Sequence, residues 1–384
     1  NEIMLHDPEL HYLDNAATTI VAPEVADVID KAMREHWANP SSLYAPGARS
    51  EEALNAARAA VARTLGCRSK ELYFTSCGSE GNNLALLGAA QTRTFGKGIV
   101  VSGFEHPSVQ RPLERLAAQG YNVTVVKPQA DGTLDINKML DAVDKNTILV
   151  ACMMVNNEIG TRSDVERLAA EVKRRNSRTI VHVDAVQAWM RVPIKLDNID
   201  TMTVSGHKIH APKGVGALYI RKGLRFPPLI RGGGQENGLR SGTEATAQLA
   251  AFAEAARLGK AEMARDTAHM AALKEQAMER LTKEVPGLKV VNPQGAPHIL
   301  AVTMPGYKSE VVVRWLSDRG VYLSSGSACH KGKPSHVFAA LGLPKPELDG
   351  ALRISFSGDT TQEDLDALIQ GLAQAQKELF TSLS

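Results

Sequence analysis

Two charged residues follow apolar runs in a pattern that suits cofactor chemistry. The apolar run 180–183 ends in Asp184, and the run 201–204 leads through a Ser-Gly-His segment to Lys208. A lysine amine can hold pyridoxal phosphate (PLP) as a Schiff base, and a carboxylate can keep the pyridine nitrogen of PLP protonated. Either residue alone is more often an ordinary surface or packed charge. Together, in this order, Asp184 and Lys208 predict a PLP enzyme.

A strand-to-helix turn upstream offers donors for the phosphate of this cofactor. After the apolar run 72–76 comes the segment Cys-Gly-Ser-Glu-Gly-Asn-Asn at 77–83, and an apolar helix follows. Small residues at such a turn expose backbone N–H groups at the positive end of a helix, which favours a phosphate dianion. An ordinary helix N-cap is the alternative. With the pair above, the segment predicts a phosphate site at Gly78 and Ser79, which Ser205 and His207 would complete unless they are simply packed.

Three further polar residues follow predicted strands. His106 comes just after the run 99–102, where the carboxyl end of a parallel strand would face a ligand. An imidazole there can stack on the pyridine ring and move protons near neutral pH, although a structural histidine is the commoner reading. Asn157 also ends a strand, and Gln187 lies three residues after Asp184. Either amide is placed to hydrogen-bond the 3′-oxygen of the cofactor.

Arg353 and Cys329 are candidates for the substrate and for nucleophilic chemistry. Arg353 interrupts the apolar run 351–355, and its planar fork fits a substrate carboxylate. A buried structural ion pair is the alternative. Cys329 ends the segment Ser-Ser-Gly-Ser-Ala-Cys, and His330, Lys331 and Lys333 follow it. These neighbours favour the thiolate, which is the nucleophilic form of cysteine.

The composition is that of an ordinary globular protein. The 384 residues include 44 basic and 42 acidic side chains, so the net charge of +2 gives no electrostatic reason to expect nucleic-acid binding. No apolar stretch approaches the ~20 residues of a membrane span, and no signal peptide is recognisable. The four cysteines have neither disulfide nor metal-ligand spacing. We therefore expect no metal, a reducing compartment and a cytoplasmic location.

The order of predicted elements indicates an α/β protein with two domains. From about residue 20 to 255, short β-rich runs alternate with helical patterns, which predicts a large α/β/α domain with a mostly parallel sheet. A long charged helix over 248–284 then leads to strands among helices, which predicts a smaller α+β domain. We expect an N-terminal segment at 1–20 that packs with the small domain, a large domain at 21–255 and a small domain at 256–384. A glycine-dense loop at 232–243 would let backbone approach a ligand or a partner chain closely.

These motifs together resemble the cysteine desulfurase family within the fold-type I PLP-dependent transferases. The resemblance covers essentially the whole chain, and its most discriminating motif is the Ser-Ser-Gly-Ser-Ala-Cys run at 324–329, typical of the iron–sulfur-cluster type. The other matching segments are 12–19, 39–42, 155–160, 182–187, 205–208 and 240–243. Only four residues separate Cys329 from Pro334, which is a shorter stretch than similar members carry.

The resemblance implies a role for each candidate residue. Lys208 would bind PLP, Asp184 would contact its pyridine nitrogen, and Cys329 would accept sulfur from L-cysteine as a persulfide, with L-alanine as the product. His106 would stack on the ring, and Asn157 and Gln187 would flank it. The phosphate would be bound by Gly78, Ser79, Ser205 and His207, joined by Thr243 from the other subunit of a homodimer. The substrate carboxylate would be bound by Asn15, Asn39 and Arg353. The persulfide would pass to an acceptor protein such as an iron–sulfur scaffold.

Other functions on the same fold remain open from the sequence. A selenocysteine lyase, another PLP-dependent C–S lyase or an aminotransferase would use the same lysine and aspartate. A non-catalytic scaffold with this fold is a second alternative. The presence of Lys208, Asp184, His106 and Cys329 together argues against the scaffold, and loss of desulfuration in a Cys329→Ala variant would distinguish the desulfurase from its PLP relatives.

Overall fold

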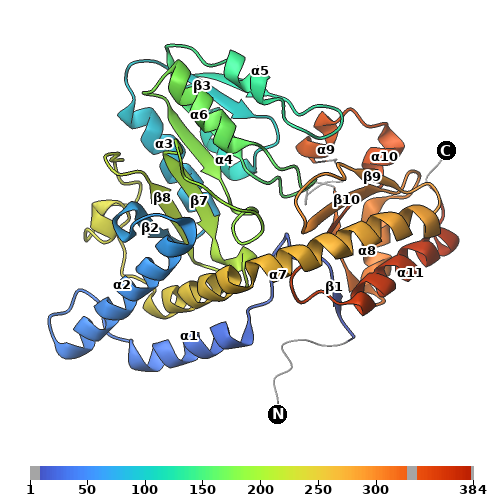
Figure 1. Ribbon diagram of the computed structural model, residues 1–384, viewed down its shortest axis with the longest axis horizontal. Coiled ribbons are helices and arrows are strands. Elements are labelled where there is room, and N and C mark those ends of the chain that lie inside the picture. The colour runs from blue at the N-terminus through green and yellow to red at the C-terminus, as the bar shows by residue number, and fades with distance from the viewer. Residues whose placement is uncertain (1–8, 327–334, 382–384) are drawn as a thin grey trace.

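Apolar, β-branched runs form a large sheet at the centre of the protein. The computed structural model describes residues 9–326 and 335–381. Strands β5 to β8 of the sheet are buried at every position, because helices cover both of its faces (Figure 1). The sheet strands in the described residues are β2 (Leu72–Thr75), β3 (Gly98–Ser102), β4 (Asn122–Val126), β5 (Thr147–Met153), β6 (Ile180–Asp184), β7 (Thr201–Ser205) and β8 (Gly216–Ile220).

The topology of this sheet brings most strand ends to one edge. Its order is β2-β8-β7-β6-β5-β3-β4, and neighbouring strands are parallel except where β8 pairs with β2 and β7. The strands predicted here from the sequence and the mostly parallel α/β fold are confirmed. Its associated helices are α1 (Pro23–Glu35), α2 (Ala45–Leu65), α3 (Gly78–Thr92), α4 (Pro107–Ala118), α5 (Ile136–Asp141) and α6 (Val165–Arg175), with short 3-10 turns η1 (Ser69–Glu71), η2 (Gly206–Lys208) and η3 (Glu236–Gly238).

A second, antiparallel sheet forms in the C-terminal part of the chain. Its order is β12-β13-β10-β9, and β1 pairs separately with β11 in parallel. The N-terminal segment thus lies against the C-terminal part, and Asp14 forms a bridge with Ser355. The elements are β1 (His11–Tyr12), β9 (Lys289–Val291), β10 (Ile299–Thr303), β11 (Val321–Tyr322), β12 (Ser324–Ser325), β13 (Ala351–Ser355), α8 (Ser309–Ser317), α9 (His336–Ala340), α10 (Lys345–Asp349) and α11 (Gln362–Glu378).

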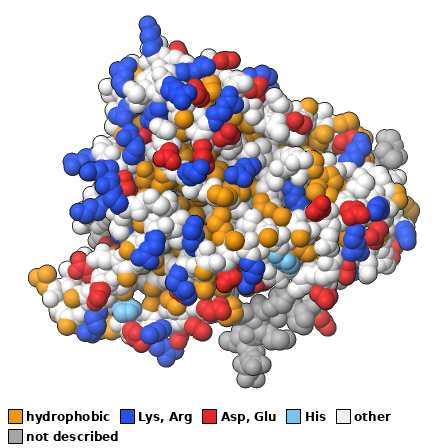
Figure 2. Space-filling view, viewed as in Figure 1, with side chains coloured by type: hydrophobic (Ala, Val, Ile, Leu, Met, Phe, Trp, Pro, Cys, Tyr) orange, Lys and Arg blue, Asp and Glu red, His pale blue; other side chains and the backbone are white. Residues whose placement is uncertain are grey.

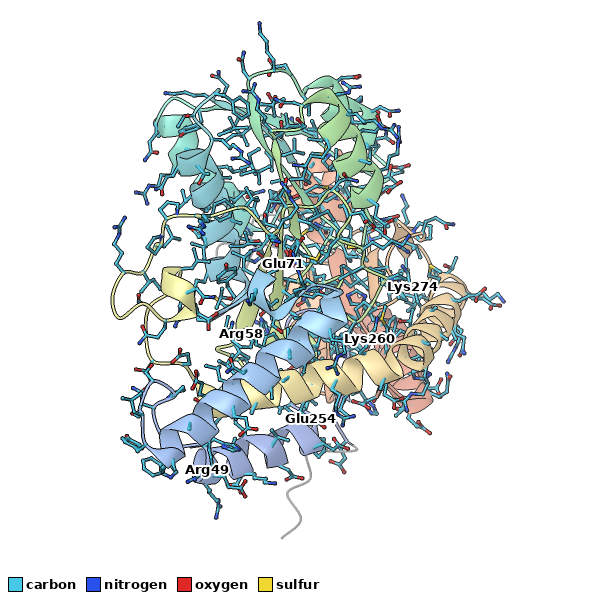
Figure 3. The ribbon with its side chains drawn as sticks, turned by 60° about the vertical axis from the view of Figure 1, so that its left-hand side comes forward. Arg49, Arg58, Glu71, Glu254, Lys260 and Lys274 are labelled. Carbon is cyan, nitrogen blue, oxygen red and sulfur yellow. The ribbon has the colours of Figure 1, made fainter. Side chains whose placement is uncertain are left out.

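One long helix connects the two sheets. Helix α7 (Thr246–Glu284) packs against α1 and α2 at its start and against α11 further along (Figure 1). Figure 3 shows Arg58 on α2 close to the first half of α7, with Lys260 and Lys274 further along α7. A capping box begins α11: Thr361 Oγ1 accepts from the N–H of Asp364, and the Asp364 carboxylate accepts from the N–H of Thr361. The division into domains at residues 20 and 255 stays a prediction.

The surface mixes charges of both signs. Figure 2 shows Lys and Arg interspersed with Asp and Glu around scattered apolar side chains on the face in view. Among the described residues, no helix is long and apolar enough to cross a membrane. The same residues contain no group of three or more histidines, cysteines or acidic residues placed to hold a metal ion.

Candidate functional site

A cavity of about 350 Å³ lies at the carboxyl ends of the parallel strands. Strands β2, β3, β5, β6 and β7 all run in the same direction, so the residues that follow them meet at one edge of the sheet. The predicted residues that line the cavity are Gly78, Ser79, His106, Asn157, Asp184, Gln187, Ser205, His207, Lys208 and Arg353.

Lys208 follows β7 on the turn η2 and directs its amine toward the N-terminal segment. Its Nζ donates to the backbone oxygens of Ala16 and Ala17, at 2.6 Å each. Burial, with the positive charge of Arg353, lowers the pKa of the Lys208 amine to about 8, although the negative Asp14 and Asp184 oppose the shift. Near neutral pH this amine therefore loses its proton more readily than an ordinary lysine, which favours attack on a carbonyl carbon.

Asp184 ends β6 beside Lys208 and is only 2% exposed. One carboxylate oxygen accepts from the backbone N–H of Val186 at 3.0 Å, and the other accepts from the Asn82 amide at 2.9 Å. These two donors hold the carboxylate at the wall of the cavity. Asp184 is therefore suited to hold a proton on a ring nitrogen in the cavity.

The start of α3 offers the donors that a phosphate requires. No side chain of the described residues caps this 15-residue helix at Cys77, and Cys77, Gly78 and Ser79 at its start line the cavity. A Cβ built on Gly78 would lie 2.9 Å from Val186 Cγ2 and 3.7 Å from Ser205 Cβ, so only glycine leaves this space open. Uncapped N–H groups, two serine hydroxyls and a glycine cradle fit a phosphate dianion.

His207 lies at the same end of the cavity as a neutral ring. Burial and the nearby Lys208 and Lys213 lower the pKa of His207 to about 4. Its Nδ1 lies 3.1 Å from Thr18 Oγ1. A neutral His207 acts toward an anion as a hydrogen-bond donor rather than as a charge.

His106 begins α4 and is held by Ser108. The backbone N–H and the hydroxyl of Ser108 lie 3.1 and 2.8 Å from His106 Nδ1. Burial, with the nearby Lys208 and His336, lowers the pKa of His106, although the negative charge of Asp184 acts in the opposite direction. The imidazole at the cavity is therefore mainly neutral at neutral pH.

The two predicted amides differ in how much of their hydrogen-bonding capacity the protein itself uses. Gln187 donates to the backbone oxygen of Ala16 at 2.8 Å and faces His298 Nε2 at 3.2 Å through its carbonyl oxygen. Asn157 contributes its backbone oxygen to Arg353 at 2.8 Å, and its side chain lines the cavity. Both residues stay candidates for the cofactor oxygen.

Arg353, on β13, closes the cavity from the side of the small sheet. Its NH2 donates to Asp14 Oδ1 at 2.8 Å and to Ser324 Oγ at 3.0 Å, so it forms the ion pair that the sequence left open as an alternative. Its Nε is buried and has no hydrogen-bond partner among the described residues. Arg353 also lines the cavity, so its guanidinium is the cationic group at this wall that could meet a substrate carboxylate.

Three predicted site residues within the described part of the chain do not line this cavity. The Asn15 amide donates to the backbone oxygens of Tyr12 and Ser355, and Asn15 lines a separate cavity of about 360 Å³. Asn39 is exposed and accepts from the N–H of Ser41. Thr243 is also exposed, on the glycine-dense loop. Cys329 lies outside the described residues, so its prediction rests on the sequence.

The structure adds residues to the site that the sequence reasoning did not single out. Asn82 and Ser108 line the cavity and connect Asp184 with His106. Cys77 also lines the cavity. A signal for Asn82 existed, because it lies one turn after Gly78 on the same face of α3.

Comparisons with known proteins agree with this geometry. The family model described as aminotransferase class-V matches residues 11–368. A cysteine desulfurase of Trichormus azollae is 38% identical over 374 residues, which cover 96% of this chain and 93% of the relative. The cysteine desulfurase IscS of Methanosarcina thermophila is 36% identical over 96% of this chain and 92% of its own length. A solved structure of a NifS-like protein superposes with a TM-score of 0.90 at 33% identity and covers 96% of this chain and 99% of that protein.

Proposed function

The chain belongs to the class-V aminotransferase family of fold-type I PLP enzymes, and we propose that it is a cysteine desulfurase. It converts L-cysteine to L-alanine and leaves the sulfur as a persulfide on Cys329. The similarity to cysteine desulfurases over nearly the whole chain supports this reaction. The meeting of Lys208, Asp184 and the uncapped start of α3 in one cavity supports its cofactor. An amine, a buried carboxylate and a phosphate cradle are the three features that PLP requires.

The residues of the cavity have distinct parts in binding the cofactor. Lys208 holds it covalently, and the Asp184 carboxylate pairs with its ring nitrogen. Gly78, Ser79, Ser205 and His207 hold its phosphate. When bound, PLP draws electrons from the α-carbon of the substrate and weakens its Cβ–Sγ bond.

The substrate binds beside Arg353, whose guanidinium pairs with the substrate carboxylate. The Lys208 amine, when free, would take the proton from the α-carbon of the substrate. The Cys329 thiolate then forms a bond to the substrate sulfur as the Cβ–S bond breaks, and the carbon left behind gains a proton. The sum is L-cysteine plus a cysteine thiol giving L-alanine plus a cysteine persulfide, so atoms and electrons balance without an added reductant.

Product analysis of one incubation tests the proposal. Wild-type protein loaded with PLP should convert L-cysteine to L-alanine, and Cys329→Ser should lose this activity by at least a hundredfold, because the nucleophile is gone. Cys67→Ser is the matched control, because Cys67 packs at the end of α2 away from the cavity. Pyruvate and free sulfide from both wild type and Cys329→Ser would instead identify a C–S lyase.

A second copy of the chain completes the site in this proposal. Met33, Trp37, Leu43 and Tyr44 are all more than half exposed near the junction of α1 with α2. A cavity of about 570 Å³ brings residues of this junction together with the glycine-dense loop 232–243. A partner that covers this face would receive Thr243 at its own phosphate site. Sedimentation at the mass of a monomer would contradict this arrangement.

The persulfide passes from Cys329 to an acceptor protein, such as an iron–sulfur scaffold. A thiol that must stay reduced between turnovers suits a reducing compartment. The cytoplasm therefore stays the predicted location.

A further inference from the structure

A line of polar side chains connects β7, β6 and α3 with the start of α4. Thr201 Oγ1 lies 2.8 Å from His182 Nδ1, and His182 Nε2 lies 2.9 Å from Asn82 Oδ1. The nitrogen of the Asn82 amide contacts Asp184 Oδ2 and Ser108 Oγ, at 2.9 Å each. Three of these residues, Thr201, His182 and Asn82, are at most 1% exposed.

The carboxylate of Asp184 fixes the direction of the first part of this line. An ionised carboxylate only accepts hydrogen bonds, so the NH2 group of Asn82 must face it and the amide oxygen must face His182. His182 therefore carries its proton on Nε2, and its Nδ1 accepts from the Thr201 hydroxyl. Burial lowers the pKa of His182 to about 3, so the ring has this one proton only.

The backbone of Ser108 fixes the direction at the other end. Its N–H can only donate, so His106 Nδ1 is an acceptor. The Ser108 hydroxyl accepts from Asn82 and donates its own hydrogen to the same Nδ1. The proton of a neutral His106 ring must then lie on Nε2.

We propose that Asn82 is a positioning residue: it donates to Asp184 and orients the Ser108 hydroxyl, so that this hydroxyl joins the Ser108 N–H in donating to His106 Nδ1 and favours the neutral Nε2–H tautomer. In the resting enzyme His106 is then a hydrogen-bond donor from Nε2, and it is not a base at that atom. Protonation of Nδ1 is opposed by the Ser108 N–H that points at it. The His106 tautomer can be tested whether or not the protein is a cysteine desulfurase. Any action of the His106 Nε2–H on L-cysteine rests on the proposed function.

The variant Asn82→Asp reverses the direction of the hydrogen bonds from residue 82 through Ser108 to His106 without changing the size of the side chain. Its carboxylate accepts the Ser108 hydroxyl hydrogen, so the Ser108 oxygen becomes an acceptor for Nδ1–H of His106. It also places a second negative oxygen against Asp184, and two adjacent carboxylates cannot both stay ionised easily. Three titratable groups act on His106, namely Asp184, Lys208 and His336.

The test is nitrogen NMR of the PLP-loaded protein labelled with 15N-histidine and without substrate. The His106 signals are assigned by their loss in His106→Gln. Wild type should show the Nε2–H tautomer alone at pH 7, and Asn82→Asp should shift His106 toward protonated Nδ1. The Kd for PLP of Asn82→Asp, measured by equilibrium dialysis, should rise on the order of 10- to 100-fold.

The double variant Asn82→Asp with Ser108→Ala separates the relay from the added charge. It lacks the hydroxyl that transmits the change, so His106 should return to the Nε2–H tautomer while the weaker PLP binding persists. Ser163→Ala, which removes another buried serine hydroxyl away from the cavity, is the matched control and should change neither signal. An Nδ1–H tautomer or an imidazolium in wild type at pH 7, or a His106 tautomer unchanged in Asn82→Asp, would overturn the proposal. Absence of desulfurase activity with an intact Nε2–H signal would instead count only against the proposed function.

Discussion

A buried carboxyl beside the site predicts a pH-dependent stability that one substitution should remove. Glu105 is 1% exposed, and its Oε2 has no hydrogen-bond partner among the described residues. Its other oxygen accepts from the Ser102 hydroxyl and from the N–H of Met153 at 2.6 Å. Burial raises the pKa of Glu105 to about 8; the two donors act against this shift, and the negative charge of Asp184 adds to it.

The direction of the effect follows from proton counting. An unfolded glutamate has a pKa of about 4.3, so between about pH 4.3 and 8 the folded state binds one proton more than the unfolded state. The contribution of Glu105 to stability is therefore complete below about pH 4.3 and is lost progressively as the pH rises to about 8. The loss is about 1.4 kcal/mol per pH unit, or about 3 kcal/mol between pH 5.5 and 8.

The variant Glu105→Gln has nearly the shape of the neutral acid but does not titrate. Urea unfolding of the PLP-loaded wild type and variant, measured at half-unit steps from pH 5.5 to 8, gives the difference in free energy of unfolding at each pH. All other titrating groups are common to both proteins and cancel in this difference. We expect Glu105→Gln to gain about 3 kcal/mol on wild type across the range, whatever its constant offset. Parallel stability curves would refute a neutral, buried Glu105.

Two substitutions test the phosphate cradle and the glycine-dense loop. Gly78→Ala should raise the Kd for PLP by roughly tenfold without unfolding the protein, since the added Cβ would meet Val186 Cγ2 at 2.9 Å. Equilibrium dialysis measures this Kd. An unchanged Kd would mean that the phosphate binds elsewhere. Arg58→Met should lower the free energy of unfolding by about 3 kcal/mol, because it leaves the buried Glu236 carboxylate without its two 2.6 Å bonds from the guanidinium. Urea unfolding compares Arg58→Met with Arg49→Met, a control variant on the same helix α2. Equal free energies of unfolding of these two variants would contradict the expected loss.

Much of the fold and part of the site followed from the sequence, for a physical reason. Apolar runs of four to seven residues that alternate with helical patterns predict a parallel sheet, and a parallel sheet brings the residues after its strands to one edge. Lys208, Asp184 and His106 follow three such strands, so their meeting in one cavity could be expected from their positions alone.

The remaining features depend on packing between distant segments. The spacing of Asn82 from Gly78 could have placed it on the cavity side of α3. Its bonds to Asp184 and Ser108 arise only where α3 lies against β6 and α4, and no sequence pattern indicates them. The ion pair of Arg353 with Asp14 joins residues 339 positions apart. The Asn15 amide donates to the backbone oxygens of Tyr12 and Ser355, and Asn15 lines a separate cavity. A short sequence motif cannot indicate these partners.

The location of the sulfur after one turnover tests the central claim most directly. The PLP-loaded protein is incubated with one equivalent of L-cysteine without reductant, alkylated and digested, and each cysteine peptide is weighed by mass spectrometry. We expect one extra sulfur atom on the peptide that carries Cys329, together with an equal amount of L-alanine. Extra sulfur on Cys77, which lines the cavity, or release of sulfide with Cys329 unmodified, would contradict it.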